Sequence, residues 1–164
     1  MASNVTYDIP EQIDPHELAA FYQRQKHQTT HSLEKLERMV QNTFCLVTAR
    51  RDGALIGIAR GVSDGVRGQL VECKLDPSCQ GPACVTRTDG RIEHDTEGIA
   101  REMARRVIDS LLESGVERIN VLAYGTEVDF CEELGFRRDS GLVPLHLDAR
   151  VPEAVGRAAK AVAS

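Results

Sequence analysis

The chain has 164 residues, which suits one compact domain, and its 41% apolar residues are enough to build a core. The formal net charge is −5, with acidic and basic residues mixed along the chain, which argues against a nucleic-acid-binding protein with a concentrated basic face. No apolar run approaches the roughly 18 residues that span a membrane, and the N-terminus lacks a signal-peptide profile, so we expect a cytoplasmic protein without a membrane partner.

The N-terminal part of the chain predicts one strand followed by two helices. Residues 5–9 alternate and indicate the strand. The first helix begins at Asp14, which caps it, with Pro15 in the first helical position and Glu17 completing a capping box. A second helix begins near Ser32, because apolar residues then recur at steps of three and four.

The middle of the chain is rich in strand signals. Asp-Gly pairs at 52–53 and 64–65 tolerate the positive φ that tight turns require. They separate three segments of strand character, so we expect a meander of three antiparallel strands at residues 44–49, 54–61 and 68–75.

The second half of the chain predicts alternating helices and strands. An amphipathic helix begins near Ile99, and Gly115 ends it. Three further elements follow: a strand at 119–123, a helix at 128–134 and a last strand at 142–147. Residues 1–150 are thus expected to form a single domain, and the alanine-rich residues 151–164 a helical or frayed tail.

Four stretches, taken in order, resemble the GNAT superfamily of acyl-CoA-dependent N-acetyltransferases. They are TARRDGALIGIARGVSDG (48–65), ECKLDPSCQG (72–81), EGIARE (97–102) and DFCEELGF (129–136). The resemblance implies an α/β fold of the α+β type, with a mixed, mainly antiparallel sheet flanked by helices on both faces. It further implies an enzyme that moves an acetyl group from acetyl-CoA to a small primary amine. The resemblance to this family also suggests a homodimer.

The family's cofactor loop indicates which residues would bind acetyl-CoA. A helix N-terminus presents unpaired backbone N–H groups to phosphate, and glycine allows a close approach. The resemblance places this role at Gln80, Gly81, Glu97, Gly98, Ile99, Ala100 and Arg101. In the family mode, backbone N–H groups around Lys74 and Leu75 would bind the thioester carbonyl.

Residues 82–96 interrupt this loop, which the family writes as one piece. Asp89-Gly90 lies between two strand-like stretches and predicts an inserted β-hairpin or flap beside the cofactor entrance. The insert is a plain surface excursion, a cover or dimer contact, or a zinc site. The zinc set would be Cys79, Cys84 and His94, with Cys73 as a fourth ligand, but its spacing is not that of a standard finger, and we expect no metal. The chain's five cysteines are expected to be free thiols.

Acyl transfer to an amine needs a base for the amine and an acid for the departing thiolate. Glu72 is the candidate base, with Asp76 as the alternative, although an ion-paired strand residue explains Glu72 equally well. The family often has Tyr where this chain has Cys131, so Cys131 is either the acid or an inert buried cysteine. Tyr124 or water could replace it.

The acceptor pocket, the mechanism and the alternative functions complete the expectations. Residues 21–31, including His27 and His31, would wall the acceptor pocket by the same resemblance. A covalent acyl-Cys131 enzyme is disfavoured, because no His is placed to activate the thiol. The interrupted loop and Cys131 leave open a non-catalytic acyl-CoA-binding or regulatory module, and the cysteine-rich insert a zinc-stabilised interaction protein.

Overall fold

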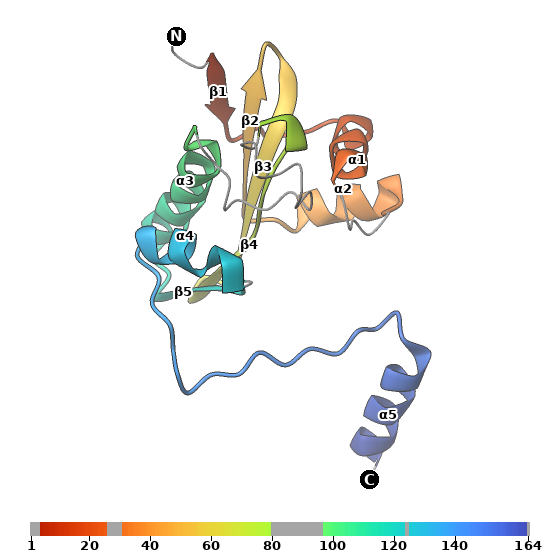
Figure 1. Cartoon of the computed structure of the whole chain (residues 1–164). Helices are drawn as coiled ribbons and strands as arrows, with labels where there is room; N and C mark the ends of the chain where they lie inside the picture. The colour runs from red at the N-terminus through yellow and green to blue at the C-terminus, as the bar shows by residue number, and fades with distance from the viewer. Residues whose placement is uncertain (1–3, 26–30, 80–96, 124, 164) are drawn as a thin grey trace.

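The computed structural model describes residues 4–25, 31–79, 97–123 and 125–163, and a five-stranded sheet dominates it (Figure 1). The strands lie in chain order: β1 (Val5–Asp8), β2 (Cys45–Arg51), β3 (Ala54–Ser63), β4 (Arg67–Leu75) and β5 (Arg118–Val121). All neighbours pair antiparallel except β4 and β5, which are parallel. The predicted mixed, mainly antiparallel sheet is therefore confirmed.

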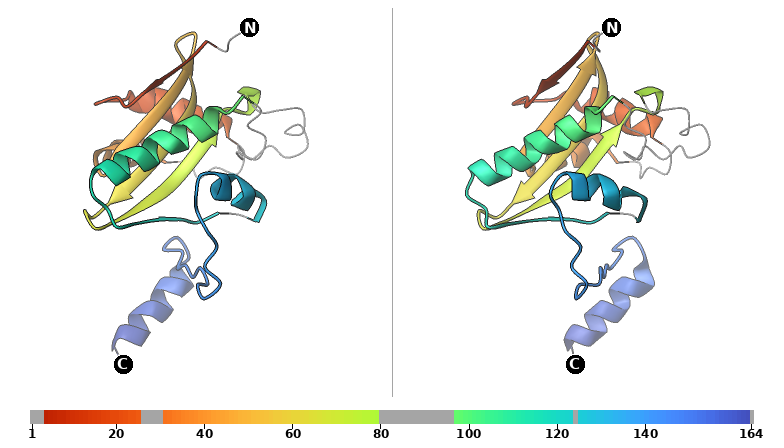
Figure 2. Two further views of the ribbon diagram at one scale, coloured as in Figure 1. Left: turned by 90° about the vertical axis from the view of Figure 1, so that its left-hand side faces the viewer. Right: turned by 60° about the vertical axis from the view of Figure 1, so that its left-hand side comes forward.

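Helices cover both faces of this sheet, as predicted. The helices α1 (Pro15–Arg24) and α2 (Leu33–Gln41) lie on one face, and α3 (Ile99–Glu113) crosses the other (Figure 2). Short elements follow β4 and β5: the 3-10 turns η1 (Pro77–Cys79) and η4 (Gly125–Glu127), and the helix α4 (Val128–Glu133). No helix in the described ranges is long and apolar enough to cross a membrane.

The predicted helix starts are confirmed at both N-terminal helices. The Asp14 carboxylate accepts from the His16 N–H at 2.9 Å, and the Ser32 hydroxyl accepts from the Lys35 N–H at 3.2 Å. These bonds satisfy backbone donors that the first helical turn leaves open. The described hydrogen bonds do not include the predicted capping box of Glu17: its carboxylate binds the Arg50 guanidinium of β2 instead, which ties α1 to the sheet.

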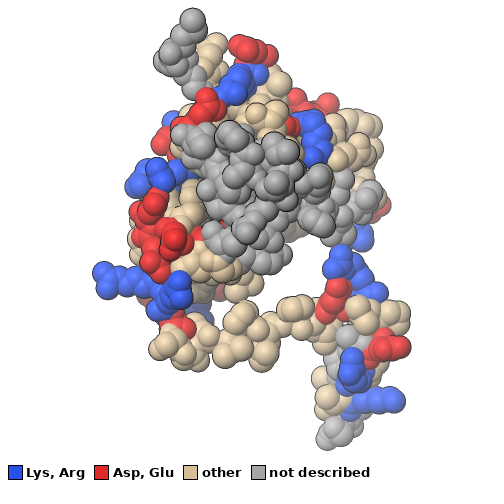
Figure 3. Space-filling view, viewed as in Figure 1, with Lys and Arg blue, Asp and Glu red and all other residues tan. Residues whose placement is uncertain are grey.

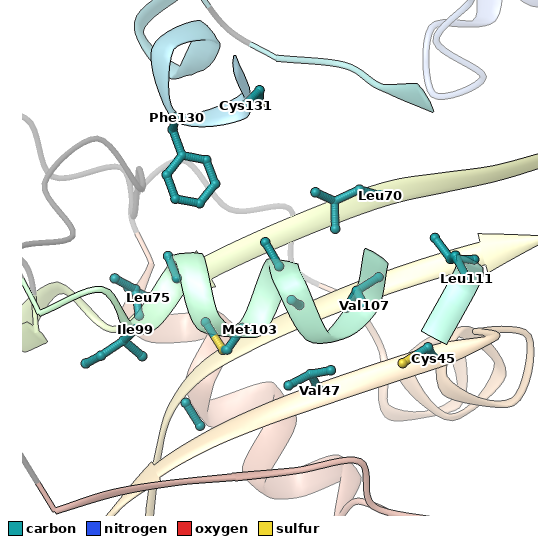
Figure 4. Packing of buried hydrophobic residues seen from close by; sticks show 14 of the residues in the cluster. Cys45, Val47, Leu70, Leu75, Ile99, Met103, Val107, Leu111, Phe130 and Cys131 are labelled. Atoms are coloured by element: carbon teal, nitrogen blue, oxygen red, sulfur yellow. The ribbon is translucent and has the colours of Figure 1, made fainter. Parts of the chain in front are cut away.

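The α3 face of the sheet is an apolar layer. Met103, Val107 and Leu111 of α3 are fully buried against β2, β3 and β4 (Figure 4). The helix comes this close because the strands present glycine beneath it. A Cβ at Gly61 would lie 2.7 Å from Val107 Cγ1, and one at Gly57 would lie 2.7 Å from Met103 Cε. The resulting core holds the α3 side of β4 rigid.

The opposite face has a smaller apolar cluster, formed by Leu18, Phe21, Leu36, Leu55, Ile58 and Tyr22. Leu18, Phe21 and Ile58 are completely buried, so α1 is anchored firmly on β3. Beside this cluster, the side chains of β3 and β4 become polar. This transition positions the candidate site.

The prediction of a last strand at residues 142–147 is wrong. These residues form no strand, and Leu142, Val143, Leu145 and Leu147 are 55–91% exposed. Their apolar alternation favours a strand only if a neighbour supplies the hydrogen bonds, and Pro144 lacks an N–H for such a ladder. The segment instead lies between α4 and the final helix α5 (Pro152–Ala163), as an uncharged strip in Figure 3.

Candidate active site

The sheet opens between β4 and β5. These strands pair over only four positions, from Arg67 opposite Arg118 to Leu70 opposite Val121. Beyond Leu70, β4 continues to Leu75 alongside β3 alone. The backbone donors predicted at Lys74 and Leu75 fall in this part of β4, from which β5 has separated.

The N-terminus of α3 lies at the same end of β4. Its cap residue Gly98 has φ +72°, in the left-handed region that favours glycine, and a Cβ built there would meet nothing within 4 Å. The Cys73 thiol of β4 contacts the Ala100 carbonyl at 3.3 Å, which fixes the first turn of α3 against the strand. Ile99 and Ala100 are buried, so this turn can offer its backbone N–H groups but not their side chains.

The two charged residues predicted for the cofactor loop are engaged in ion pairs. The Glu97 carboxylate lies 2.6 Å from the Arg51 guanidinium, and Arg101 donates to Glu133 of α4. Both pairs are substantially exposed, so water weakens them, and each can exchange its partner for a ligand at small cost. Gln80 and Gly81, the other half of the predicted loop, lie outside the described residues.

Glu72 lies in a polar cluster on the α1 side of β4. The Tyr22 hydroxyl of α1 donates to Glu72 Oε1, and Arg60 Nη2 of β3 donates to Oε2 at 3.5 Å. Arg60 Nε lies 3.2 Å from Oε1, but its N–H does not point along a hydrogen bond to any described acceptor. Arg60 Nη1 donates to the Thr43 hydroxyl at 3.1 Å.

This cluster is sheltered from water. The side chains of Arg60 and Glu72 are 10% and 16% exposed, and Tyr22 is 7% exposed. Burial, followed by the charge and hydrogen bond of Glu72, raises the pKa of Tyr22 far above its ordinary range, so Tyr22 stays protonated and is the donor. The His31 ring lies edge-on to the Tyr22 ring, with centroids 6.4 Å apart.

Asp76, the alternative base, is already bound. Its carboxylate accepts from Arg24 of α1 and from the backbone and hydroxyl of Ser78. Burial opposes the charge of Asp76, but the hydrogen bonds from Arg24 and Ser78 outweigh it and lower its pKa. A carboxylate with a lowered pKa is a weaker base, which counts against Asp76 in that role.

Gln25 lies directly beyond α1 and ties that helix to the end of β4. It is 3% exposed, and its Nε2 donates to the Leu75 carbonyl at 3.1 Å. Its Oε1 has no hydrogen-bond partner in the described part of the chain. A buried amide oxygen without a donor is uncommon and marks a position where a ligand's N–H would be favourable.

Cys131 lies in the core rather than in the opening of the sheet. It is 6% exposed and belongs to the α3-side cluster with Phe130 (Figure 4). Burial, and then the charge of Glu127, raises the pKa of its thiol to about 11. An effective proton donor has a pKa near the working pH. The burial and raised pKa of Cys131 therefore favour an inert buried cysteine over the catalytic acid.

The remaining predicted residues lie elsewhere. Tyr124 and His27 are outside the described ranges, as are Cys84 and His94 of the zinc set and the whole predicted hairpin. Within the ranges that are described, no group of three or more His, Cys, Asp or Glu could hold a metal ion. Tyr22 lies within residues 21–31, which were expected to wall the acceptor pocket, but its bond to Glu72 was not predicted. Sequence reasoning missed Arg60 as a site residue, because it comes opposite Glu72 only through an irregularity in the β3–β4 pairing.

The fold is shared with known enzymes, although no family model and no curated protein matches the chain. A GNAT-family acetyltransferase from Streptococcus pneumoniae superposes with a TM-score of 0.62 at 18% identity, over 88% of this chain and 99% of that one. An aminoglycoside acetyltransferase from a soil metagenomic sample, in complex with sisomicin, gives 0.63 at 14% identity, over 88% and 96%.

A third neighbour is the ribosomal-protein-S18-alanine N-acetyltransferase from Escherichia coli, with a TM-score of 0.62 at 18% identity, over 83% of this chain and 79% of that one. The chain therefore has the fold of GNAT-family acetyltransferases. The names of the second and third neighbours give them different acceptors, an aminoglycoside and a protein alanine. The fold thus leaves the acceptor open.

Proposed function

We propose that the protein is an acyl-CoA-dependent N-acetyltransferase that moves an acetyl group from acetyl-CoA to a small primary amine. The observation that carries this proposal is the opening of the sheet beyond Leu70, with the glycine-capped N-terminus of α3 at the same end of β4. Phosphates of the donor would lie at the backbone N–H groups that begin α3. Backbone donors around Lys74 would stabilise the oxyanion of the tetrahedral intermediate.

In this proposal Glu72 is the base. The amine attacks the thioester carbonyl, the new C–N bond replaces the C–S bond, and the amine proton passes to Glu72 directly or through water. Tyr22 and Arg60 hold the carboxylate in place, which reduces the reorganisation that the step requires. The departing thiolate takes a proton from solvent or from Tyr124, because Cys131 is buried with a raised pKa.

The ion pair of Glu72 with Arg60 and the buried Cys131 also favour the second candidate, a non-catalytic acyl-CoA-binding module. Two assays separate the candidates. Calorimetric titration with acetyl-CoA tests binding, and thiol release across a panel of amines tests turnover. We expect micromolar binding and turnover, with Glu72→Gln lowering kcat about 100-fold while acetyl-CoA binding is kept. Binding without turnover by any amine would instead identify the non-catalytic module.

A matched pair of glycine variants tests the cofactor position. Gly98→Ala places a side chain at φ +72°, which strains the cap of α3 and should weaken acetyl-CoA binding about tenfold. Gly125→Ala is the control, because a Cβ there also meets nothing within 4 Å and its φ lies outside the left-handed region. Equal acetyl-CoA affinity of the two variants would remove the start of α3 from the binding site.

A further inference from the structure

The Lys74 side chain belongs to the same polar cluster as Glu72. Alternate residues of a strand share a face, so Glu72 and Lys74 of β4 both face α1. Contacts with one residue confirm this: Tyr22 donates its hydroxyl to Glu72, and Lys74 Nζ lies 5.6 Å from the centroid of the Tyr22 ring. The ammonium group therefore lies beside the proposed base, on the side of the sheet opposite α3.

The charges of this cluster do not balance. Its two carboxylates, Glu72 and Asp76, are each bound by an arginine, Arg60 and Arg24 respectively. Lys74 is the third cation, and in the described part of the chain no carboxylate lies within ion-pair distance of it. The ring face of Tyr22 is a weak substitute for an anion. Counted over the described residues, the cluster thus has one excess positive charge, in a chain whose net charge is −5.

A second, independent observation also points to a ligand here. Gln25 is 3% exposed, its Nε2 donates to the carbonyl of Leu75, the residue after Lys74, and its Oε1 has no partner among the described residues. Among the described residues, the site therefore combines a cation without an anion and a buried acceptor without a donor. A molecule with both an amine and a carboxylate would satisfy both groups.

We propose that the acceptor is an amino carboxylic acid, with its carboxylate bound by Lys74 and its amine N–H bound by Gln25 Oε1 and directed toward Glu72. This inference rests on the proposed acetyl transfer and specifies its substrate class. The products are an N-acetylated amino acid and free CoA, with the proton of the amine leaving through Glu72. Lys74 is then a specificity-determining residue, in addition to the role proposed for its backbone.

The test compares each amino acid with its own amide, which has the same amine but no carboxylate. Thiol release is measured for the full chain and for two variants, Lys74→Met and Lys74→Arg. We expect the natural chain to use amino acids at least about tenfold better than their amides in kcat/KM, because one charge-assisted contact is lost in the amide. Lys74→Met should abolish this preference for the carboxylate over the amide, whereas Lys74→Arg should keep most of it.

Three results would overturn the inference. One is equal or better use of the amides by the natural chain. Another is an unchanged preference in Lys74→Met. The third is weaker acetyl-CoA binding by Lys74→Met in calorimetry, which would make Lys74 a donor-binding residue. Failure of the proposed function looks different: the natural chain would release no thiol with any amine, charged or neutral, and the inference would fall with it.

Discussion

The two faces of the sheet differ in whether their polar and charged side chains have partners. On the α3 face, Met103 and Val107 pack over glycines of β3, and the layer is apolar throughout. On the α1 face, the apolar cluster around Ile58 gives way to ion pairs, to Lys74 without a carboxylate partner among the described residues, and to a buried amide oxygen that has no donor among them. Among the described residues, the apolar layer under α3 has no polar side chain without a partner, whereas the α1 face has two.

This contrast suggests that the α3 face stabilises the fold and that the α1 face recognises the acceptor. A closely packed face fixes β4 and α3 relative to each other, because buried side chains at native density resist displacement. The strand so fixed presents Glu72 and Lys74 on its other side. We therefore expect substitutions on the α3 face to act on stability, and those on the α1 face to act mainly on acceptor recognition.

The largest effect on stability is expected from Met103→Ala. Met103 is fully buried between α3 and the glycine-lined strands, so truncation leaves a cavity and should lower the free energy of unfolding by about 2–5 kcal/mol. Urea denaturation measures the change. Leu112→Ala on the same helix is the control, because Leu112 is 57% exposed and its loss should stay within about 0.5 kcal/mol. Similar losses at both positions would contradict a rigid α3 face.

A smaller effect is expected from Arg60→Met, which would sharpen the description of the α1 face. It leaves the sheltered Glu72 carboxylate with Tyr22 alone and should destabilise the fold by about 1–3 kcal/mol. Adding Glu72→Gln removes the stranded charge, so the double variant should recover much of that loss. A double-variant cycle in urea checks this coupling. Additive losses would show that Arg60 and Glu72 do not depend on each other.

Much of the fold could be predicted from the sequence, because local signals and the tertiary structure agree. Asp14 and Ser32 cap their helices as predicted, and the turn at Asp52-Gly53 has positive φ at both residues. The absence of a strand at 142–147 could not be predicted. The apolar alternation there is a local signal, whereas strand formation requires a neighbouring strand to pair with. Alternation alone did not determine the outcome.

The candidate site was less predictable, for a physical reason. Glu72 and Gly98 belong to short local motifs, so the resemblance could find them. Tyr22 and Gln25 lie on or next to a helix about 50 residues before β4, and only packing brings them to Glu72 and Leu75. Lys74 was predicted only for its backbone. Its side chain could not be singled out, because the sequence does not show that the nearby carboxylates of Glu72 and Asp76 are bound by arginines.

The smallest effect concerns the pH dependence of stability at Asp76. Its folded pKa is lowered from an ordinary value of 3.8, so its contribution is fully present above that value and is lost as pH falls through the folded pKa. Asp76→Asn should therefore lose less stability than the natural chain between about pH 5 and about pH 2. Because the partner Arg24 has 45% of its side chain exposed, the difference should stay below about 1 kcal/mol.

Urea denaturation at several pH values measures the Asp76 effect, with Asp109→Asn on the exposed side of α3 as control. We expect the control to follow the natural chain over the whole pH range. If the free energy of unfolding of Asp76→Asn also had the same pH dependence as that of the natural chain, the bonds from Arg24 and Ser78 would contribute no net stability in water. The pairing of Asp76 would then have to be explained by the site, where it leaves Lys74 as the cation without a carboxylate partner in the described part of the chain.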